Sequence, residues 1–200
     1  MPAGAAHGQV VTDADWYGRD LSGSRWVECR FTGVDLTEAD LSGAVFDRCV
    51  LERCRLNAAV LEHTALTACR LTGCSLFAAR LTGCKLDGTA FAGCTLRPVT
   101  VDGGSWWGVS LTAADLSGQR LTGLRLQESD LSGARLAGTV LTGSDLSHAA
   151  LRHTDLSGAD LRGAVLTGAD LTGADLSGTR VDLPGAVALA ESLGARVHTD

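Results

Sequence analysis

The feature that most constrains this chain is a five-residue repeat that runs through almost its whole length. A large apolar residue occupies every fifth position from Trp16 to Val181, and 26 of these 34 positions are Leu. A second column lies two residues before the first and holds almost only Ala, Cys, Ser, Thr, Val or Gly. Its exceptions are Arg19, Gln119 and Leu124. Self-similarity at a fixed interval is the signature of a repeat architecture, in which one small unit stacks on the next.

A period of five identifies the kind of unit. An α-helix repeats every 3.6 residues and a strand every two, so neither alone places every fifth residue on one face. A short extended piece followed by a corner does, because two residues that are two apart in such a piece point the same way. Gly often follows two residues after the large apolar residue, as at Gly173 and Gly178, where it permits a sharp turn. The pattern predicts an all-β solenoid whose coils stack at about 4.8 Å.

The repeats also carry a family resemblance. Segments such as ADLRG (159–163) and ADLTG (169–173) resemble the A(D/N)LXX consensus of pentapeptide-repeat proteins. The resemblance covers about residues 14–181 and implies a right-handed quadrilateral β-helix with four pentapeptides in each coil, hence a rod roughly 40 Å long. We therefore expect an N-terminal tail over residues 1–13, the β-helix over residues 14–181, and a C-terminal helix and cap over residues 182–200.

The sequence after the last repeat predicts a short helix. Asp182 can cap its N-terminus, Pro184 fits its first turn, and Gly194 can end it. An apolar stripe along this helix has two interpretations: a lid over the last coil, which any solenoid needs, or a dimer contact. We favour the dimer contact, which the resemblance also implies. The residues expected in that interface are Leu183, Ala186, Val187, Leu189, Ala190 and Leu193.

The seven cysteines do not predict a metal or redox site. All of them fall in the small-residue column, there is no CxxC pair, and no histidine lies in an inward column of the repeat. We expect free thiols that pack like the Ala, Ser and Thr residues of the same column. No catalytic constellation is visible elsewhere, so the sequence predicts a protein that is not an enzyme and needs no cofactor.

The middle of the chain is the least regular part of the repeat. Gly104 replaces a larger inner residue just before Trp106, and we expect it to make room for that indole ring. Trp107 should point outward, as should Tyr17 and Phe77 at equivalent sites. Exposed aromatic residues can anchor a partner protein, so Trp107 is a candidate partner-binding residue. An isolated exposed aromatic residue, however, often has no function.

Charge and hydropathy exclude two classes of function. There are 17 Lys and Arg residues against 23 Asp and Glu, a net charge of −6. This balance argues against a nucleic-acid binder that neutralises phosphates. No apolar run approaches the length of a membrane span, and no secretory signal is visible. We expect no membrane association and a cytoplasmic location.

A narrower resemblance suggests a function. The Pro-containing segment 94–102, the C-terminal helix and the absence of inserted loops resemble the MfpA and Qnr type of pentapeptide-repeat protein, although Qnr proteins do insert loops. That resemblance implies a dimeric rod about as wide as B-DNA. Such a rod binds DNA gyrase in place of a DNA segment, and it inhibits the enzyme or protects it from fluoroquinolones and other gyrase poisons.

The charge distribution partly supports DNA mimicry. Residues 1–50 carry a net charge of −4, residues 101–150 one of −2 and residues 151–200 one of −3, whereas residues 51–100 carry +3. If two chains join at their C-termini, the centre of the long rod is therefore acidic, although carboxylates at these positions could equally serve solubility. The gyrase-binding residues expected on this acidic saddle are Asp115, Asp130, Asp145, Asp155, Asp160, Asp170 and Asp175.

Two other functions stay open on the sequence alone. The rod could be a self-immunity factor that guards gyrase against a natural product made by the same cell. It could also be a passive interaction scaffold with another partner, because a fold does not determine a function.

Overall fold

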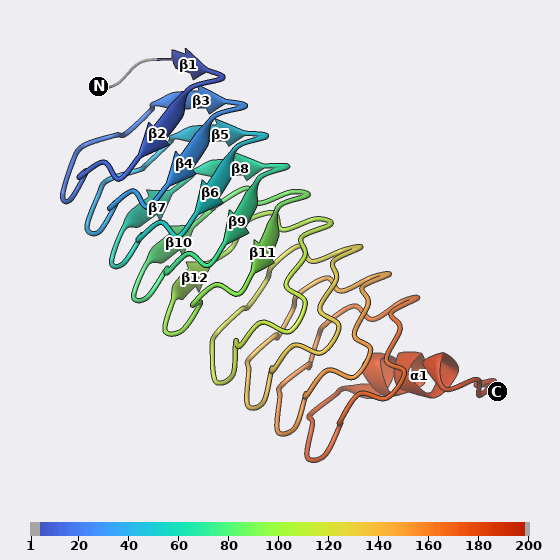
Figure 1. The fold of residues 1–200 in the computed structure, drawn as a ribbon. Coiled ribbons are helices and arrows are strands. Elements are labelled where there is room, and N and C mark those ends of the chain that lie inside the picture. Colours follow the sequence, from blue (N-terminus) through green and yellow to red (C-terminus); the bar gives the residue numbers. More distant parts are fainter. Residues whose placement is uncertain (1–4, 199–200) are drawn as a thin grey trace.

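The computed structural model describes residues 5–198, which form one straight-sided rod of stacked coils with a helix at its C-terminal end (Figure 1). Every strand pair is parallel, and each residue pairs with the residue 20 positions further along the chain, from Ala5 with Arg25 to Asp160 with Arg180. Four pentapeptides therefore make one coil. The prediction of a quadrilateral β-helix with a short C-terminal helix is confirmed.

Three of the four faces contain a sheet of three-residue strands. The first face carries the order β1-β3-β5-β8, the second β11-β9-β6-β4-β2 and the fourth β12-β10-β7, whereas the third is held by isolated bridges from Asp15 to Asp175. Further bridges extend the first, second and fourth faces to Val165, Asp170 and Arg180. The strands are β1 Ala5–His7, β2 Val10–Thr12, β3 Arg25–Val27, β4 Arg30–Thr32, β5 Val45–Asp47, β6 Val50–Glu52, β7 Val60–Glu62, β8 Ala65–Thr67, β9 Arg70–Thr72, β10 Arg80–Thr82, β11 Ala90–Ala92 and β12 Thr100–Asp102.

The core is the pair of columns that the repeat defines. The large apolar residues from Trp16 to Leu171 are buried, and so are most of the small residues two positions before them. Four aromatic rings fill the first coils, where Trp26 stacks on Phe46 with ring centroids 4.5 Å apart. Because each coil is covered by the next, the large apolar residues that follow Trp16 stay buried until the last repeats, where Leu176 and Val181 are partly exposed.

Most corners of the rod are tight turns that begin at the large apolar residue. The N–H of Ala39, for example, donates to the carbonyl of Leu36 at 3.1 Å, and Glu38, the second of the two residues between them, has a φ of +57°. A positive φ at the third position of a four-residue turn is the mark of type II geometry and favours Gly. This confirms the predicted role of Gly at that position, although Ala58, with a φ of +53°, shows that other residues also adopt the conformation.

The first coil starts earlier than the sequence pattern suggested. β1 pairs with β3 and β2 pairs with β4, so regular structure begins at Ala5 and not near residue 14. The large apolar column does not reach this far, but Ala6 and Val11 continue its register and pack against the core. A smaller side chain at the end of the rod has less surface to bury, which is why this part of the repeat is weak in the sequence.

The helix α1, Leu183–Ser192, closes the other end of the rod. Asp182 caps it as predicted: its Oδ1 accepts from the N–H of Gly185 at 3.0 Å, while its Oδ2 accepts from the N–H of Gly163 in the preceding coil at 2.7 Å. One carboxylate therefore both starts the helix and fixes it to the rod. Across residues 5–198 there is no helix with the length and apolar character needed to cross a bilayer.

Candidate interaction surface

The aspartates of the predicted acidic saddle have a structural role at the corners. In each of the seven, Oδ1 accepts a hydrogen bond from the backbone N–H two residues later, as from Ser157 to Asp155 at 3.0 Å. This is an Asx turn, which shapes the corner of the coil. Aspartates near the other end of the rod, such as Asp20 and Asp40, make the same contact. The recurrence of Asp in the repeat therefore follows from the fold as well as from solubility.

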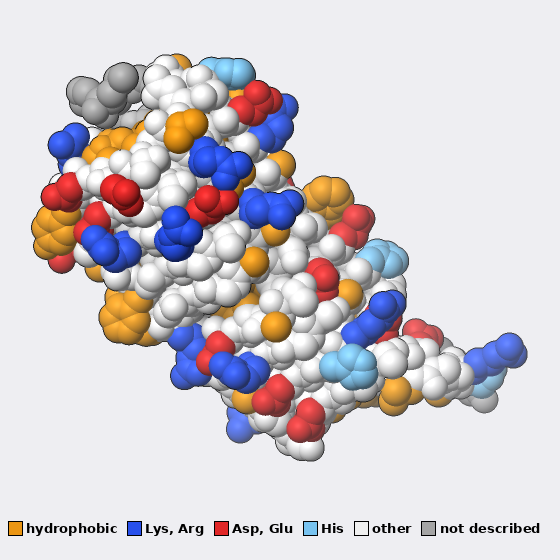
Figure 2. All heavy atoms as spheres, viewed as in Figure 1, with side chains coloured by type: hydrophobic (Ala, Val, Ile, Leu, Met, Phe, Trp, Pro, Cys, Tyr) orange, Lys and Arg blue, Asp and Glu red, His pale blue; other side chains and the backbone are white. Residues whose placement is uncertain are grey.

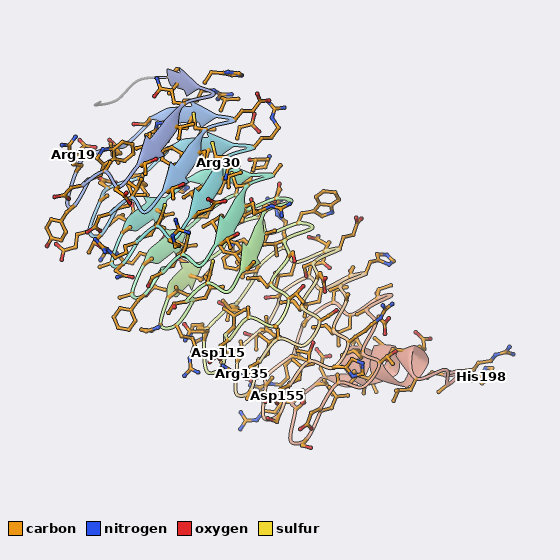
Figure 3. All side chains as sticks on the ribbon, in the orientation of Figure 1. Arg19, Arg30, Asp115, Arg135, Asp155 and His198 are labelled. Carbon is orange, nitrogen blue, oxygen red and sulfur yellow. The ribbon has the colours of Figure 1, made fainter. Side chains whose placement is uncertain are left out.

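The seven predicted aspartates do not form one continuous patch. Their positions are separated by the rotation of the coil, which places consecutive pentapeptides on consecutive faces. The first face holds Asp145, the second Asp130 and Asp170, the third Asp115, Asp155 and Asp175, and the fourth Asp160. Along the third face Asp115, Arg135 and Asp155 follow one another, one coil apart (Figure 3).

Three of the seven aspartates are ion-paired with arginines. Asp115 lies 2.9 Å from Arg135 and 3.1 Å from Arg97; burial raises its pKa, but hydrogen bonds from Arg135, Ser117 and Arg97 outweigh that effect and hold the pKa well below its usual range. Asp160 is bonded through both oxygens by Arg162, which lowers its pKa to about 2.

The third ion pair joins Asp170 and Arg152. The pKa of Asp170 is lowered to about 2, first by the hydroxyl of Thr172 and then by Arg152. Neutralisation by arginine reduces the field that these three aspartates present to a partner. On the face shown in Figure 2, acidic and basic side chains are interspersed along the rod.

Four predicted aspartates have no arginine or lysine within ion-pair distance in the part of the chain that the structure describes. These are Asp130, Asp145, Asp155 and Asp175, and we call them the unpaired aspartates. Asp155 and Asp175 are joined by a backbone β-bridge between adjacent coils of the third face, so their side chains lie on the same face. Asp130 lies on the neighbouring second face. They are the strongest remaining candidates for an acidic contact.

The rod is interrupted near its middle, which the sequence analysis did not predict. In a regular coil the large apolar residue donates its N–H to the next coil, as Leu76 does to Thr95 at 2.8 Å and Leu116 to Arg135 at 2.9 Å. Among residues 5–198 no backbone acceptor is found for the equivalent N–H groups of Leu96 and Val101.

The interruption affects only two of the four faces. The bridges that would join Thr95 to Asp115 on the third face and Thr100 to Arg120 on the fourth are missing from the described chain. On the first and second faces the ladder continues, for example through Ser105 to Arg125. The two halves of the rod therefore stay joined along two faces and separate along the other two.

Two residues, Pro98 and Gln119, explain the interruption. Pro98 has no N–H to donate to the next coil. The N–H of Ala78 in the preceding coil bonds the carbonyl of Pro98, one residue beyond the regular partner position. Gln119, an exception in the small-residue column, replaces a backbone bond: its Oε1 accepts from the N–H of Val99 at 3.0 Å.

The separation leaves an open cavity, which we call the mid-rod cleft. In Figure 1 the gap between the coil that contains β12 and the coil that follows it is wider than the gaps between the other successive coils. The cavity has a volume of about 490 Å³. Its lining residues are Cys94, Thr95, Leu96, Arg97, Pro98, Asp115 and Gln119. Inner-column residues that elsewhere are buried, such as Cys94 and Ala114, are partly exposed here.

Gly104 has a different role from the predicted one. Its φ is +117°, and a Cβ at this position would lie 2.4 Å from the carbonyl oxygen of Cys84 in the preceding coil. We predicted that Gly104 makes room for the ring of Trp106. The main reason for a glycine here is instead that the backbone of the preceding coil lies too close for a Cβ atom. Trp106 is buried as expected, while Trp107 is exposed.

The helix α1 presents two faces. Leu189 and Ala188 pack against the last coils, so part of the predicted dimer interface lies against the chain's own rod. Leu183 and Leu193, by contrast, are 78% and 73% exposed; they lie at the two ends of the helix, on the side that faces away from the rod. The outer stripe comprises Leu183, Ala186, Val187, Ala190 and Leu193. A lid and an outward apolar surface therefore coexist on one helix.

The cysteines hydrogen-bond as the hydroxyl residues of their column do. The thiol of Cys69 donates to the carbonyl of Phe46 at 3.3 Å, and the hydroxyl of Thr64 donates to that of Leu41 at 2.7 Å. Six of the seven cysteines are buried and all seven are free thiols. Within residues 5–198 no group of three His, Cys, Asp or Glu side chains is arranged to hold a metal ion.

Comparison with known proteins identifies the family. The model for a pentapeptide repeat region matches residues 24–101, and the model for pentapeptide repeats matches residues 110–147 and 144–181. The chain belongs to the pentapeptide-repeat family. Comparison with curated protein sequences finds no match.

Two solved structures are similar over nearly the whole chain. A trypsin-treated variant of QnrB1, a plasmid-mediated fluoroquinolone resistance protein, is 26% identical with a TM-score of 0.65, covering 99% of each chain. HetL, a pentapeptide-repeat protein involved in the regulation of heterocyst differentiation in the cyanobacterium Nostoc sp. strain PCC 7120, is also 26% identical. Its TM-score is 0.57, and the match covers 92% of this chain and 91% of HetL.

Proposed function

We propose that this protein is a non-enzymatic, DNA-mimicking rod that acts in the cytoplasm. It binds DNA gyrase, modulates or inhibits it, and protects it from fluoroquinolones or other gyrase poisons. The observation that carries the proposal is the similarity to the fluoroquinolone resistance protein QnrB1 along 99% of both chains. The shape supports it, because the rod described over residues 5–198 has no inserted loops and offers a side that a groove for duplex DNA can accept.

The unpaired aspartates support a contact with gyrase over part of the rod, and not mimicry of duplex DNA along its full length. A duplex carries one negative charge in about every 1.7 Å, far more than this chain provides. Residues 101–200 carry a net charge of −5 and residues 1–100 one of −1, although residues 1–50 alone carry −4; arginines also neutralise three of the carboxylates in the C-terminal half. We therefore propose that gyrase contacts the C-terminal half of the rod, through Asp130, Asp145, Asp155 and Asp175.

Dimerisation through α1 would double this surface. We propose that the outer stripe of one chain packs on that of a second copy, which would remove exposed Leu183 and Leu193 from water. Leu183→Asp combined with Leu193→Asp should give monomers in sedimentation velocity, whereas a double variant that stays dimeric would contradict this interface. Leu189 is unsuitable for this test, because it packs against the rod of its own chain.

The first experiment is a gyrase supercoiling and cleavage assay with the purified protein, with and without ciprofloxacin. We expect inhibited supercoiling without the drug, or restored activity with it. No effect at tens of micromolar protein would contradict gyrase binding.

The charge of the unpaired aspartates can be tested without damaging the corners. Asn keeps the oxygen that accepts the Asx-turn hydrogen bond and removes the negative charge. The test variant changes Asp130, Asp145, Asp155 and Asp175 to Asn. The matched control changes four corner aspartates at the other end of the rod, namely Asp15, Asp20, Asp35 and Asp40.

Both variants lose four charges, so the comparison isolates position. We expect the C-terminal variant to lose potency against gyrase by at least tenfold and the N-terminal control to keep most of it. Equal losses would indicate a non-specific effect of net charge, and no loss in either variant would exclude these aspartates from the contact.

A second candidate function is an interaction scaffold with another partner. The similarity to HetL favours it, because that protein is involved in regulating differentiation and matches this chain at the same sequence identity as QnrB1. The same assay separates the two, since a scaffold for another partner leaves gyrase unaffected. A self-immunity role uses the same contact with gyrase and differs in the poison, which should then be a natural product.

A further inference from the structure

The interruption near the middle of the rod extends over half of one turn. On the second face, just before it, Phe91 still donates its N–H to Ser110 at 2.9 Å, and on the first face, just after it, Trp106 donates to Arg125 at 2.8 Å. Between these two bonds, five N–H groups have no backbone acceptor within residues 5–198: those of Leu96, Val101, Gly103, Asp115 and Arg120. The break is therefore centred on the corner between the third and fourth faces.

The corner on the opposite side of the rod, between the first and second faces, keeps its bonds. There Gly88 donates to Trp107 and Gly108 donates to Gln127, both at 2.8 Å. Backbone ladders on one side resist stretching, whereas the other side has none at this level. Bending about the intact corner is therefore the motion that the pattern of hydrogen bonds permits.

Two side-chain contacts cross the mid-rod cleft where the backbone bonds are absent, and we call them the latch. Arg97 lies 3.1 Å from the carboxylate of Asp115, and Oε1 of Gln119 accepts from the N–H of Val99 at 3.0 Å. Asp115 is also held from its own side of the break by Arg135, at 2.9 Å. The side chains of Arg97 and Asp115 are 46% and 32% exposed, so water competes for this ion pair. Such a contact can both hold the cleft closed and release it.

The cleft can take up water as it opens. Its volume of about 490 Å³ is many times that of one water molecule, and water can bond the backbone groups that have no partner there. Leu96 and Val101, the inner residues above the break, are each 7% exposed, against 1% and 2% for Leu116 and Leu121 below it. The core thus remains in contact across the break, which limits how far the cleft can open.

We propose that the mid-rod cleft is a hinge, about which the two halves of the rod bend relative to each other, and that the latch favours its closed form. Opening lengthens the third and fourth faces and leaves the first and second faces at the same length. A partner that lies along the third or fourth face of both halves therefore meets a surface whose curvature adjusts. A partner on the opposite side meets a rigid one.

The test is a distance measurement by pulsed electron paramagnetic resonance on the full chain. Nitroxide labels are attached to ketone side chains, which leaves the native cysteines unmodified. The third-face pair replaces Phe77 and Ser177, and the control pair replaces Thr72 and Thr172 on the second face. All four residues are exposed, and each pair is 100 residues and hence five coils apart.

Labelled chains are mixed with an excess of unlabelled chain, so that a dimer adds no second distance. In the native protein we expect a broader distance distribution for the third-face pair than for the control pair. Both pairs span the interruption, so a general flexibility of the rod would broaden them equally.

Two substitutions on either side of Asp115 isolate the latch. Arg97→Ser removes the ion pair that crosses the cleft, whereas Arg135→Ser removes one within the C-terminal half. Each removes one positive charge, and Ser occurs at equivalent positions of the third face, as Ser117 and Ser75. We expect Arg97→Ser to lengthen the mean third-face distance by about 3 Å or more, over half the spacing of two coils, and Arg135→Ser to change it by less than about 1 Å. The control distance should stay the same in both.

A further variant should close the hinge. Pro98→Gly restores an N–H at the corner and Gln119→Ala restores a small inner residue, so the double variant has the residue types of a regular coil. We expect its third-face distribution to become as narrow as that of the control pair.

The hinge is overturned by a native third-face distribution as narrow as the control that Arg97→Ser leaves unchanged. Equal effects of Arg97→Ser and Arg135→Ser would overturn the role of the latch. None of these readouts uses gyrase, so the hinge can fail or succeed independently of the proposed function.

Discussion

Gly104 offers a sharp test of how closely the coils approach one another. A methyl group at this position would lie 2.4 Å from the Cys84 carbonyl oxygen and 3.1 Å from its backbone nitrogen, closer than atoms in proteins normally come. Backbone cannot move aside as the end of a flexible side chain can. In addition, a φ of +117° lies outside the left-handed region that Ala adopts at the corners of this rod.

The cost of Gly104→Ala can be estimated from these two effects. A residue held in a sparsely populated backbone conformation costs about 1–3 kcal/mol, and overpacking costs about another 1–3 kcal/mol. We expect a loss of about 2–6 kcal/mol in the free energy of unfolding, which for a chain of this size lowers the melting temperature by roughly 4–24 °C. The matched control is Gly103→Ala: its φ is +59° and nothing lies within 4 Å of the added methyl group, so it should cost only about 1 kcal/mol.

Chemical denaturation followed by circular dichroism measures both variants. A double-mutant cycle with Trp106→Leu then distinguishes the two explanations of Gly104. If the glycine served to make room for the indole ring, the smaller leucine would rescue Gly104→Ala. The steric argument is refuted by such a rescue, or by equal stabilities of Gly104→Ala and Gly103→Ala within about 0.5 kcal/mol.

Three further predictions follow from contacts elsewhere in the rod. In hydrogen exchange, the amide of Leu96 should exchange faster than that of Leu116, because Leu116 donates to the next coil and Leu96 does not; equal protection would contradict the interruption. The pKa of Asp160 is lower in the folded chain than its ordinary value, so its stabilising contribution should be complete above about pH 4 and lost as the pH falls through about 2. The difference in melting temperature between the native chain and Asp160→Asn should therefore disappear near pH 2. Finally, Asp182→Ala should increase exchange throughout α1 while Asp182→Asn largely preserves protection, because Asn retains an acceptor for the Gly185 amide.

The regular part of this fold could be predicted because one pattern specifies it many times. A large residue at every fifth position and a small one two positions before it determine which side chains point inward, and the structure buries both columns. The N-terminal coil was missed since Ala6 and Val11 are smaller than the rest of the column. The pattern weakens where the core ends, so the position of the boundary cannot be derived from it.

The interruption was not predicted, although its signals are in the sequence. Pro98, Gly104 and Gln119 are departures from the repeat; Pro98 and Gln119 line the mid-rod cleft, and Gly104 lies between them in the chain. Their combined effect depends on which residues lie one coil apart, since Gln119 bonds Val99 across a separation of 20 residues. Likewise, which aspartates pair with arginine depends on contacts between coils, as between Asp115 and Arg135.

The 20-residue pairing distance also determines what lengths this protein can adopt. Each coil contacts mainly its two neighbours, so removing a complete block of 20 residues from a regular stretch would shorten the rod and leave every remaining side chain on its original face. Removing five residues would preserve the core pattern equally well, but it would turn the whole downstream surface by a quarter of a revolution. Natural variation in the length of such a rod should therefore occur in whole coils wherever one side must keep facing the same partner.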